Sequence, residues 1–351
     1  MIYIDGAQKS GSGTIVRFAV GLATLLGEEL RLTNIRAKRE KPGLRPQHLK
    51  AIQALQQLCQ GTLDGGKVGS KEIRFKSSGK IKGGNYQWNI GTAGSTTLLA
   101  MTLLPVACFS NEAIHFKISG GLFQDFAPSA YHMQYVLFPV LNKMGIAARL
   151  SIIRPGYVPK GGGIIEVKLK PMMGKIKPIR LISQDNVTGV QGIALSSHLK
   201  GSQVSERMAK TCNEILKSNG YHSRIEIIHD TMALQKGAAL AIYAKTDSGC
   251  IVGADRAGAP GRASEEIGRY VAMSLVEDLA TGATVDRYLA DQLILYAALA
   301  DGVSQYRIPR LTEHIETNLW LVENVLGAKT VVNTNLVKIH GVGYYPSQFT
   351  N

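Results

Sequence analysis

The order of secondary structure repeats along this chain, and that repetition constrains the fold more than any other feature. A strand, a helix, a second strand, a second helix and a closing strand follow one another, and the order then returns twice. Such repetition indicates that one supersecondary unit builds most of the molecule. The first unit is predicted at residues 2–5, 11–26, 30–36, 47–59 and 73–76.

The second and third units follow the same order. The second is predicted at residues 86–90, 95–108, 114–119 and 129–143, with a closing hairpin at 148–153 and 164–170. The third begins near residues 179–182, is interrupted, and resumes at 285–300, 305–307, 312–326, 329–332 and 336–340. The predicted fold class is therefore α/β (α+β), with three copies of one unit.

The interruption in the third unit has a pattern of its own. Strands are predicted at residues 190–196, 223–228 and 238–244, and helices at 204–218 and 265–279. Asn219-Gly220 ends the first of these helices, because both residue types favour helix termination. We therefore predict a small inserted α/β domain at residues 186–281, within a core formed by residues 1–185 and 282–351.

Composition permits a large core and indicates a polyanionic partner. Hydrophobic residues make up 45% of the 351 residues and charged residues 19%, which excludes wholesale disorder. The 40 Lys and Arg exceed the 26 Asp and Glu, for a net charge of +14. This excess favours nucleic acid or a nucleotide as partner. A generally basic proteome is the alternative explanation.

The cysteines and apolar segments favour a cytoplasmic protein. The four cysteines lie far apart without a CxxC pair or metal-ligand spacing, which fits a reducing compartment. A strand predicted at the first residues leaves no signal peptide before the fold. The longest apolar stretch, residues 96–109, contains Pro105 and is too short to span a bilayer.

Each unit carries a histidine near the start of its second helix: His48, His132 and His314. Common ancestry of the units, with partly buried structural histidines, explains any one of them taken alone. His314 follows Thr312, a good N-cap, so it lies in a first helical turn where the helix dipole lowers a histidine pKa. A neutral, nucleophilic imidazole beside an anion-binding helix end suits a phosphoryl acceptor.

Two further segments carry chemistry. Tyr288, Asp291 and Gln292 share one helical face, where a ring can stack on a base while the amide and carboxylate contact its edge; an ordinary solvated face is the alternative. Residues 36–48 hold five basic side chains within ten residues, which suits phosphate. An exposed basic loop is the alternative there.

The glycine-rich stretches at 6–13, 91–94 and 160–163 contain no Walker A motif.

Together these residues resemble the RNA 3'-terminal phosphate cyclase family, from Asp5 to about Gly341. Many ordered matches are far more specific than any single motif. The anchors are Asp5-Gly6-Ala7-Gln8, Ile35-Arg36-Ala37, Lys41-Pro42-Gly43, Gln47-His48, Gly91-Thr92-Ala93-Gly94-Ser95, Gly156-Tyr157-Val158-Pro159-Lys160-Gly161-Gly162-Gly163, Tyr288-Leu289-Ala290-Asp291-Gln292 and His314 before Thr317-Asn318.

The resemblance implies βαβαββ units like those of enolpyruvate transferases, with a small inserted domain. It also implies that the residue matching His314 attacks the α-phosphate of ATP, that AMP passes to an RNA 3'-phosphate, and that the 2'-OH then closes a 2',3'-cyclic phosphate. Mg²⁺ or Mn²⁺ would assist. No metal ligands and no oligomeric state are identified.

The resemblance assigns further residues to the site. The adenylate would contact Tyr288, Leu289, Ala290, Asp291, Gln292, Pro128 and Met101. The phosphates would contact Arg17, Arg36, Arg39, Gln47 and His48.

The sequence departs from the family pattern at five positions, two of them adjacent. Ser10 stands where a glutamate is usual, Met101 replaces a glutamine of the ATP site, Leu122-Phe123 replaces Thr-Asp, and Pro155 replaces a histidine or arginine. These departures concern metal use and specificity and leave His314 in place. Two other functions fit the architecture: a non-catalytic cyclase-like RNA-binding protein of ribosomal RNA processing, and an enolpyruvyl-type transferase.

Overall fold

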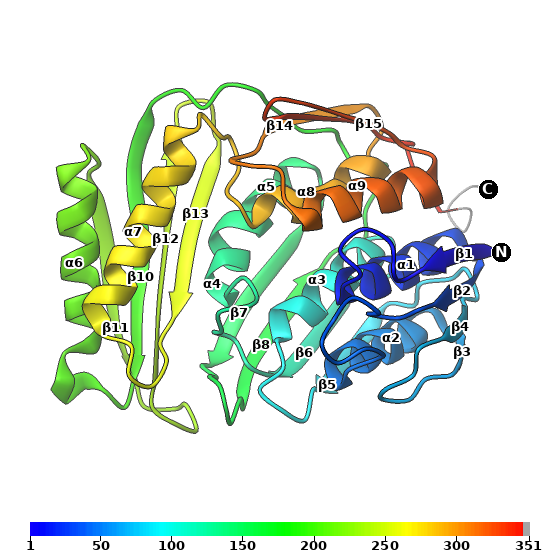
Figure 1. The fold of residues 1–351 in the computed structure, drawn as a ribbon, viewed down its shortest axis with the longest axis horizontal. Coiled ribbons are helices and arrows are strands. Elements are labelled where there is room, and N and C mark those ends of the chain that lie inside the picture. Colours follow the sequence, from blue (N-terminus) through cyan, green and yellow to red (C-terminus); the bar gives the residue numbers. More distant parts are fainter. Residues whose placement is uncertain (347–351) are drawn as a thin grey trace.

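The computed structural model describes residues 1–346, and three of its four sheets share one topology. In each, two parallel strands lead into an antiparallel pair, in the order β1-β2-β4-β3, β5-β6-β8-β7 and β9-β14-β16-β15. The βαβαββ repeat is thus confirmed. Figure 1 shows these units with their helices gathered between the sheets.

The bounds of the three units are as follows. The first comprises β1 (Ile2–Asp5), α1 (Gly13–Leu26), β2 (Glu29–Thr33), α2 (Pro46–Cys59), β3 (Thr62–Asp64) and β4 (Ile73–Lys76). The second comprises β5 (Gly84–Asn89), α3 (Thr96–Ala107), β6 (Ile114–Gly120), α4 (Ala130–His132), η1 (Met133–Leu137), α5 (Phe138–Lys143), β7 (Ala148–Arg154) and β8 (Gly163–Leu169). The third comprises β9 (Arg180–Leu181), α8 (Leu289–Leu299), β14 (Val303–Arg307), α9 (Glu313–Leu326), β15 (Lys329–Asn333) and β16 (Leu336–His340).

The first helix of each unit, α1, α3 and α8, lies in the shared core. Almost every residue of α8 is buried, and α1 buries eleven residues. The strands alternate: β6 reads buried and half-buried in turn along its length. One face of each sheet therefore packs on the helices while the other faces solvent.

The fourth sheet lies between β9 and α8 in the chain. It comprises β10 (Val187–Ser197), α6 (Val204–Ser218), β11 (Ser223–Asp230), β12 (Gly237–Thr246), β13 (Ile251–Ala257) and α7 (Ser264–Ala280), in the strand order β11-β10-β12-β13. Helices α6 and α7 form a separate hydrophobic cluster with one face of this sheet. The opposite face contributes Ile193, Ala241 and Tyr243 to the main core. The division at residues 186–281 stays a prediction.

Some elements differ from the sequence predictions for local reasons. The helix predicted from residue 285 begins at Leu289, because the Asp286 side chain accepts the Tyr288 and Leu289 N–H groups and so ends the preceding turn. The helix predicted at 129–143 contains a π-helical segment before Pro139. The strands β3 and β13 were not predicted. No helix within residues 1–346 is long and apolar enough to cross a membrane.

Candidate active site

His314 lies in the first turn of α9, as predicted. The Thr312 hydroxyl accepts the Ile315 N–H at 3.3 Å and caps the helix. His314 Nδ1 lies 3.3 Å from the hydroxyl oxygen of Thr14, in the first turn of α1. That hydroxyl also accepts a hydrogen bond from Arg17 at 3.4 Å. Two helix N-termini and an arginine therefore converge on one imidazole.

The surroundings keep His314 neutral. Its residue is solvent-accessible, but neighbouring atoms cover part of the ring, and this desolvation lowers its pKa. The charges of Arg17 and Arg39 lower the pKa further, while Glu313 opposes them. Within the described residues, Nε2 has no hydrogen-bond partner. The structure thus presents a neutral imidazole whose Nδ1 is engaged and whose Nε2 is free to react.

His48 lies close to the same helix end but is buried. Its Nδ1 accepts the Arg45 N–H at 3.4 Å, and a Cβ placed on Gly13 would lie only 2.1 Å from its Nε2. Glycine is therefore required at position 13 for α1 to meet the ring. Burial, and then Arg17, Arg36 and Arg45, lower the pKa of His48 to about 3.

The predicted phosphate residues surround this point with positive charge. Burial lowers the pKa of Arg17 to about 10, so its guanidinium stays charged at neutral pH. Arg36 is tied to its own loop by donating to the Lys41 and Gly43 carbonyls at 2.6 and 3.0 Å. We call Arg17, Arg36, Arg39, Arg45, Gln47, His48 and His314 the phosphate cluster.

Gln47 joins the phosphate cluster to the second unit. A Cβ on Gly94 would lie 3.7 Å from Gln47 Cβ. Gly94 in turn accepts a hydrogen bond from the Gly121 N–H at 2.9 Å, at the end of β6. The glycine-rich loop at 91–94 therefore lies against the start of α2.

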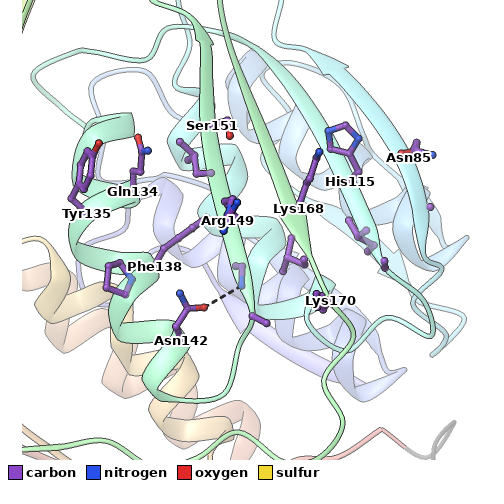
Figure 2. Close-up of a pocket in the computed structure, with 18 residues that line it drawn as sticks. Asn85, His115, Gln134, Tyr135, Phe138, Asn142, Arg149, Ser151, Lys168 and Lys170 are labelled. Atoms are coloured by element: carbon purple, nitrogen blue, oxygen red, sulfur yellow. Dashed lines mark hydrogen bonds between the residues drawn. The ribbon is translucent and has the colours of Figure 1, made fainter. Parts of the chain in front are cut away.

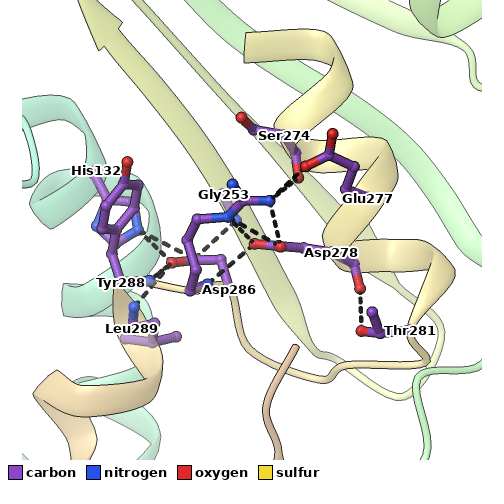
Figure 3. A network of polar contacts seen from close by, with 10 residues as sticks. His132, Gly253, Ser274, Glu277, Asp278, Thr281, Asp286, Tyr288 and Leu289 are labelled. Carbon is purple, nitrogen blue, oxygen red and sulfur yellow. Dashed lines mark hydrogen bonds and ion pairs between the residues drawn. The ribbon is translucent and has the colours of Figure 1, made fainter. Parts of the chain in front are cut away.

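His132 has a different role from the other two unit histidines. Its Nε2 lies 3.1 Å from both oxygens of Asp286, and both side chains are buried (Figure 3). Asp286 also accepts the N–H groups of Gly253, Tyr288 and Leu289 at 2.8–2.9 Å. Burial alone lowers the pKa of His132, but Asp286 outweighs it and raises that pKa. This pair fixes the start of α8.

The predicted adenylate residues are distributed around that helix start. Tyr288 is half-buried and contacts the His132 ring edge-on, with centroids 5.8 Å apart. Burial raises the pKa of Asp291 to about 7, although Arg17 opposes the shift. Asp291 thus links α8 electrostatically to the phosphate cluster.

The remaining adenylate residues are mostly enclosed. Gln292 is buried, and neither atom of its amide has a hydrogen-bond partner within the described residues. It lines a small cavity of about 10 Å³ together with Met101 and Phe18. Leu289 and Ala290 are fully buried in the core. Pro128 is buried and its carbonyl accepts the Thr97 hydroxyl at 2.8 Å.

Ser10 and Asp125 both have structural partners. Ser10 is buried, donates to Ser12 at 3.0 Å and accepts from Thr317 at 2.9 Å, so it joins the loop after β1 to α9. Asp125 pairs with Arg262 at 2.7 and 2.8 Å. Within residues 1–346, no group of three or more His, Cys, Asp or Glu could hold a metal ion.

Sequence reasoning missed Thr14 and Asp286. Thr14 is an ordinary helix residue whose partner is 300 positions away, and no local signal marks it. Asp286 two residues before Tyr288 is a helix-capping residue, and that spacing could have found it. Its pairing with His132, 154 positions away, could not have been read from the chain.

Comparisons with known proteins agree on one family. The family model described as RNA 3'-terminal phosphate cyclase matches residues 8–332. Similar curated proteins with that name come from Pyrococcus furiosus (38% identical over 330 residues, 93% of this chain and 94% of the relative) and Staphylothermus marinus (35% over 357 residues, 99% of each). One from Methanopyrus kandleri is 35% identical over 331 residues, 93% of each chain.

Among solved structures, the enolpyruvyl transferase NikO from Streptomyces tendae aligns at 11% identity with a TM-score of 0.28. The alignment covers 97% of this chain and 51% of that chain. A score this low carries no weight for the fold or the site.

Proposed function

The chain belongs to the RNA 3'-terminal phosphate cyclase family, and on that premise we propose that it uses ATP to convert an RNA 3'-phosphate into a 2',3'-cyclic phosphate through adenylylated His314. One observation carries this proposal above the others. His314 combines an accessible ring, a lowered pKa and a free Nε2 beside two helix N-termini. Helix N-termini attract phosphate, and a neutral imidazole is the form that attacks it.

In the first step, His314 Nε2 attacks the α-phosphorus of ATP. A nitrogen–phosphorus bond forms, the bond from that phosphorus to the α–β bridging oxygen breaks, and pyrophosphate leaves. Thr14 holds Nδ1 and thereby orients the ring. Arg17 and Arg39 supply positive charge near the reacting phosphates, where it stabilises the charge that develops in the transition state.

In the later steps, an oxygen of the RNA 3'-phosphate attacks the adenylyl phosphorus and frees His314. The 2'-OH of the same ribose then attacks the 3'-phosphorus, closes the cyclic ester and expels AMP. The phosphates of ATP and the 3'-phosphate of the RNA are both negatively charged. The phosphate cluster can therefore bind the nucleotide and the RNA end in turn. Arg36, Gln47 and His48 belong to this role in the proposal, with Arg36 also bracing its loop.

Adenine recognition is assigned to the region around the start of α8. Tyr288 would stack on the base, with Pro128 on the other side, and Asp291 and Gln292 would contact its edge. The unpartnered Gln292 amide supports a polar contact with a ligand in this region. Leu289 and Ala290 would hold these residues in place from the core.

The described residues do not fit a protein-built metal site. No step above is routed through Mg²⁺ or Mn²⁺, and a divalent cation is proposed only as a companion of the ATP phosphates. We also assign residues 186–281 as an inserted domain and the cytoplasm as the compartment, since all four cysteines are free and buried.

Labelling with α-³²P ATP tests the proposal. Wild-type protein should carry label after denaturing electrophoresis, and His314→Ala should carry none while its circular dichroism and melting are unchanged. His340→Ala, an exposed histidine on β16, is the matched control and should label normally. A non-catalytic RNA-binding protein would bind 3'-phosphorylated RNA without any label in the wild type.

A further inference from the structure

We propose that the solvent face of the second unit's sheet, β5-β6-β8-β7, binds the single-stranded RNA that leads up to the 3'-end. We call this surface the RNA groove, defined by Asn85, His115, Lys168, Arg149, Lys170 and Tyr135, which line a groove of about 1060 Å³. The inference deepens the proposed function and rests on it. It adds a site for the body of the substrate, separate from the phosphate cluster.

The strand register places the first four of these residues in one row. Asn85 pairs with His115, His115 with Lys168, and Lys168 with Arg149 across the four strands. Figure 2 shows the four side chains in this order across the sheet. Neighbouring strands are ~4.8 Å apart, so the row is ~14 Å long. It presents hydrogen-bonding and cationic groups at regular intervals.

The basic side chains of the row lack acidic partners. Lys168 and Arg149 are exposed and directly opposite, an arrangement that is destabilising for like charges. Within the described residues, neither they nor Lys170 make an ion pair. The acid of the next row, Glu166, already contacts His115 at 3.5 Å and Lys117 at 4.0 Å. An anionic ligand such as a phosphate backbone would relieve this repulsion.

The equivalent face of the first unit is different. There Arg31 pairs with Glu72 at 2.7 Å, and Arg74 is flanked by Asp64 in the next strand. Glu29 lies opposite Lys76 in the same sheet. Arg31 also lies directly opposite Arg74, but Glu72 and Asp64 lie beside this pair, so a basic row without acidic partners is a property of the second unit rather than of the repeat.

An aromatic side chain borders the basic row. Tyr135 on η1 lines the groove and stacks on Tyr243 of β12, with centroids 5.2 Å apart and planes at 6°. Lys245 lies 5.6 Å from the Tyr243 ring and extends the positive surface toward β10. Aromatic rings beside cations are the combination that binds single-stranded nucleic acid without sequence preference.

The geometry sets a minimum RNA length. The row crosses β6 at His115, five residues from Gly120, which is ~16 Å of strand. Gly121 and Gly94 connect that end of β6 to Gln47 in the phosphate cluster. RNA whose 3'-end lies in the phosphate cluster must therefore extend over at least this ~16 Å to reach the row. A dinucleotide is too short.

The test compares two RNAs with the double variant Arg149→Glu/Lys168→Glu. Fluorescence anisotropy would measure the Kd of a single-stranded 20-nucleotide RNA and of a dinucleotide, both with a 3'-phosphate. We expect the variant to bind the 20-mer about 10-fold more weakly or worse, and its salt slope to fall by ~1.4, since two phosphate contacts contribute ~0.7 each. The dinucleotide should bind the variant with the same Kd as it binds the wild type.

Arg74→Glu/Lys76→Glu makes the same charge change on the first unit's face and is the control. The assignment of the RNA groove is wrong if the control variant raises the Kd of the 20-mer equally. It is also wrong if the groove variant leaves that Kd unchanged. Labelling by α-³²P ATP should be unchanged in both variants. Absence of label in the wild type would overturn the proposed function alone, because RNA binding is measured without ATP.

Discussion

The second and third units place a histidine at the same point of the same fold, yet the two side chains have opposite surroundings. His132 is buried against Asp286, and the carboxylate raises its pKa. His314 is accessible, and desolvation with two arginines lowers its pKa. The repeat therefore supplies the position, whereas residues from outside each unit's own helix decide the chemistry.

The first unit gives a third outcome. His48 is buried like His132 but has arginines for neighbours, as His314 has, and its pKa falls to about 3. Of His48, His132 and His314, only His314 is both neutral and accessible. His314 and His48 both have lowered pKa values, so protonation state alone does not distinguish them. The difference is that His314 is accessible, whereas His48 is packed against Gly13.

The largest expected effect is on stability, at the buried His132–Asp286 pair. Asp286→Ala leaves His132 without its partner and removes the cap of α8, so the free energy of unfolding should fall by ~3–5 kcal/mol. Urea denaturation measures this. Asp301→Ala removes an exposed pair with Lys175 and should cost at most ~1 kcal/mol. Equal losses would mean that the His132–Asp286 pair has no special role.

The two buried histidines should also have opposite effects on the pH dependence of stability. The pKa of His48 is below its unfolded value of 6.5, so the stabilisation by neutral His48 is lost as pH falls from about 6.5 toward 3. At pH 5 the loss is ~2 kcal/mol relative to neutral pH. The pKa of His132 is raised, so its contribution is present below 6.5 and is lost as pH rises through the folded value.

Urea melts of wild type, His48→Gln and His132→Gln at several pH values measure these contributions. The His48 variant should lose less stability on acidification than the wild type, and the His132 variant should lose more. If both variants change the pH profile in the same direction, the comparison between the two histidines fails.

A smaller effect is expected at the adenylate residues. If Tyr288 stacks on adenine, Tyr288→Ala should weaken ATP binding by ~1–3 kcal/mol, the usual contribution of a base–aromatic stack. Isothermal titration calorimetry measures it, and Tyr288→Phe, which keeps the ring, should bind nearly as the wild type does. ATP binding that survives the alanine change would remove Tyr288 from the site. Equal use of GTP and ATP would argue against Asp291 and Gln292 as readers of the base.

The smallest effect concerns the electrostatics of His314. Arg39 lowers the pKa of His314, so Arg39→Ala should raise it and move the acid limb of the adenylylation rate to higher pH. The shift should be below about one pH unit, because charges near the surface are screened by salt. Arg74→Ala, in the first sheet, is the control. A shift toward lower pH would contradict the assigned environment of His314.

Much of the fold was predictable because periodicity and turn residues are local signals. The repeat, the placement of α9 behind Thr312, and the elements β10, α6, β11, β12 and α7 all follow from residue spacing. The π-helical segment in the second unit and the short strand β3 were not, since they depend on packing against other units.

The resemblance supplied candidate site residues, whose roles stay a prediction, but not the contacts that they make. The resemblance named His314, Arg17 and Gln292, which the structure distributes around α1, α8 and α9. It could not indicate that Thr14 holds the histidine or that Ser10 is bonded to Thr317, because these partners lie about 300 positions apart. Long-range pairs of small polar residues leave no pattern in a single sequence.

The most direct test of the account is to find the modified atom. Wild-type protein incubated with ATP, digested at alkaline pH and analysed by fragmentation mass spectrometry should yield one adenylylated peptide, with the adenylyl group on His314 and the linkage stable to base but labile to acid. The peptides containing His48 and His132 should be unmodified. Adenylylation of either of those histidines, or of any residue other than His314, would contradict the account.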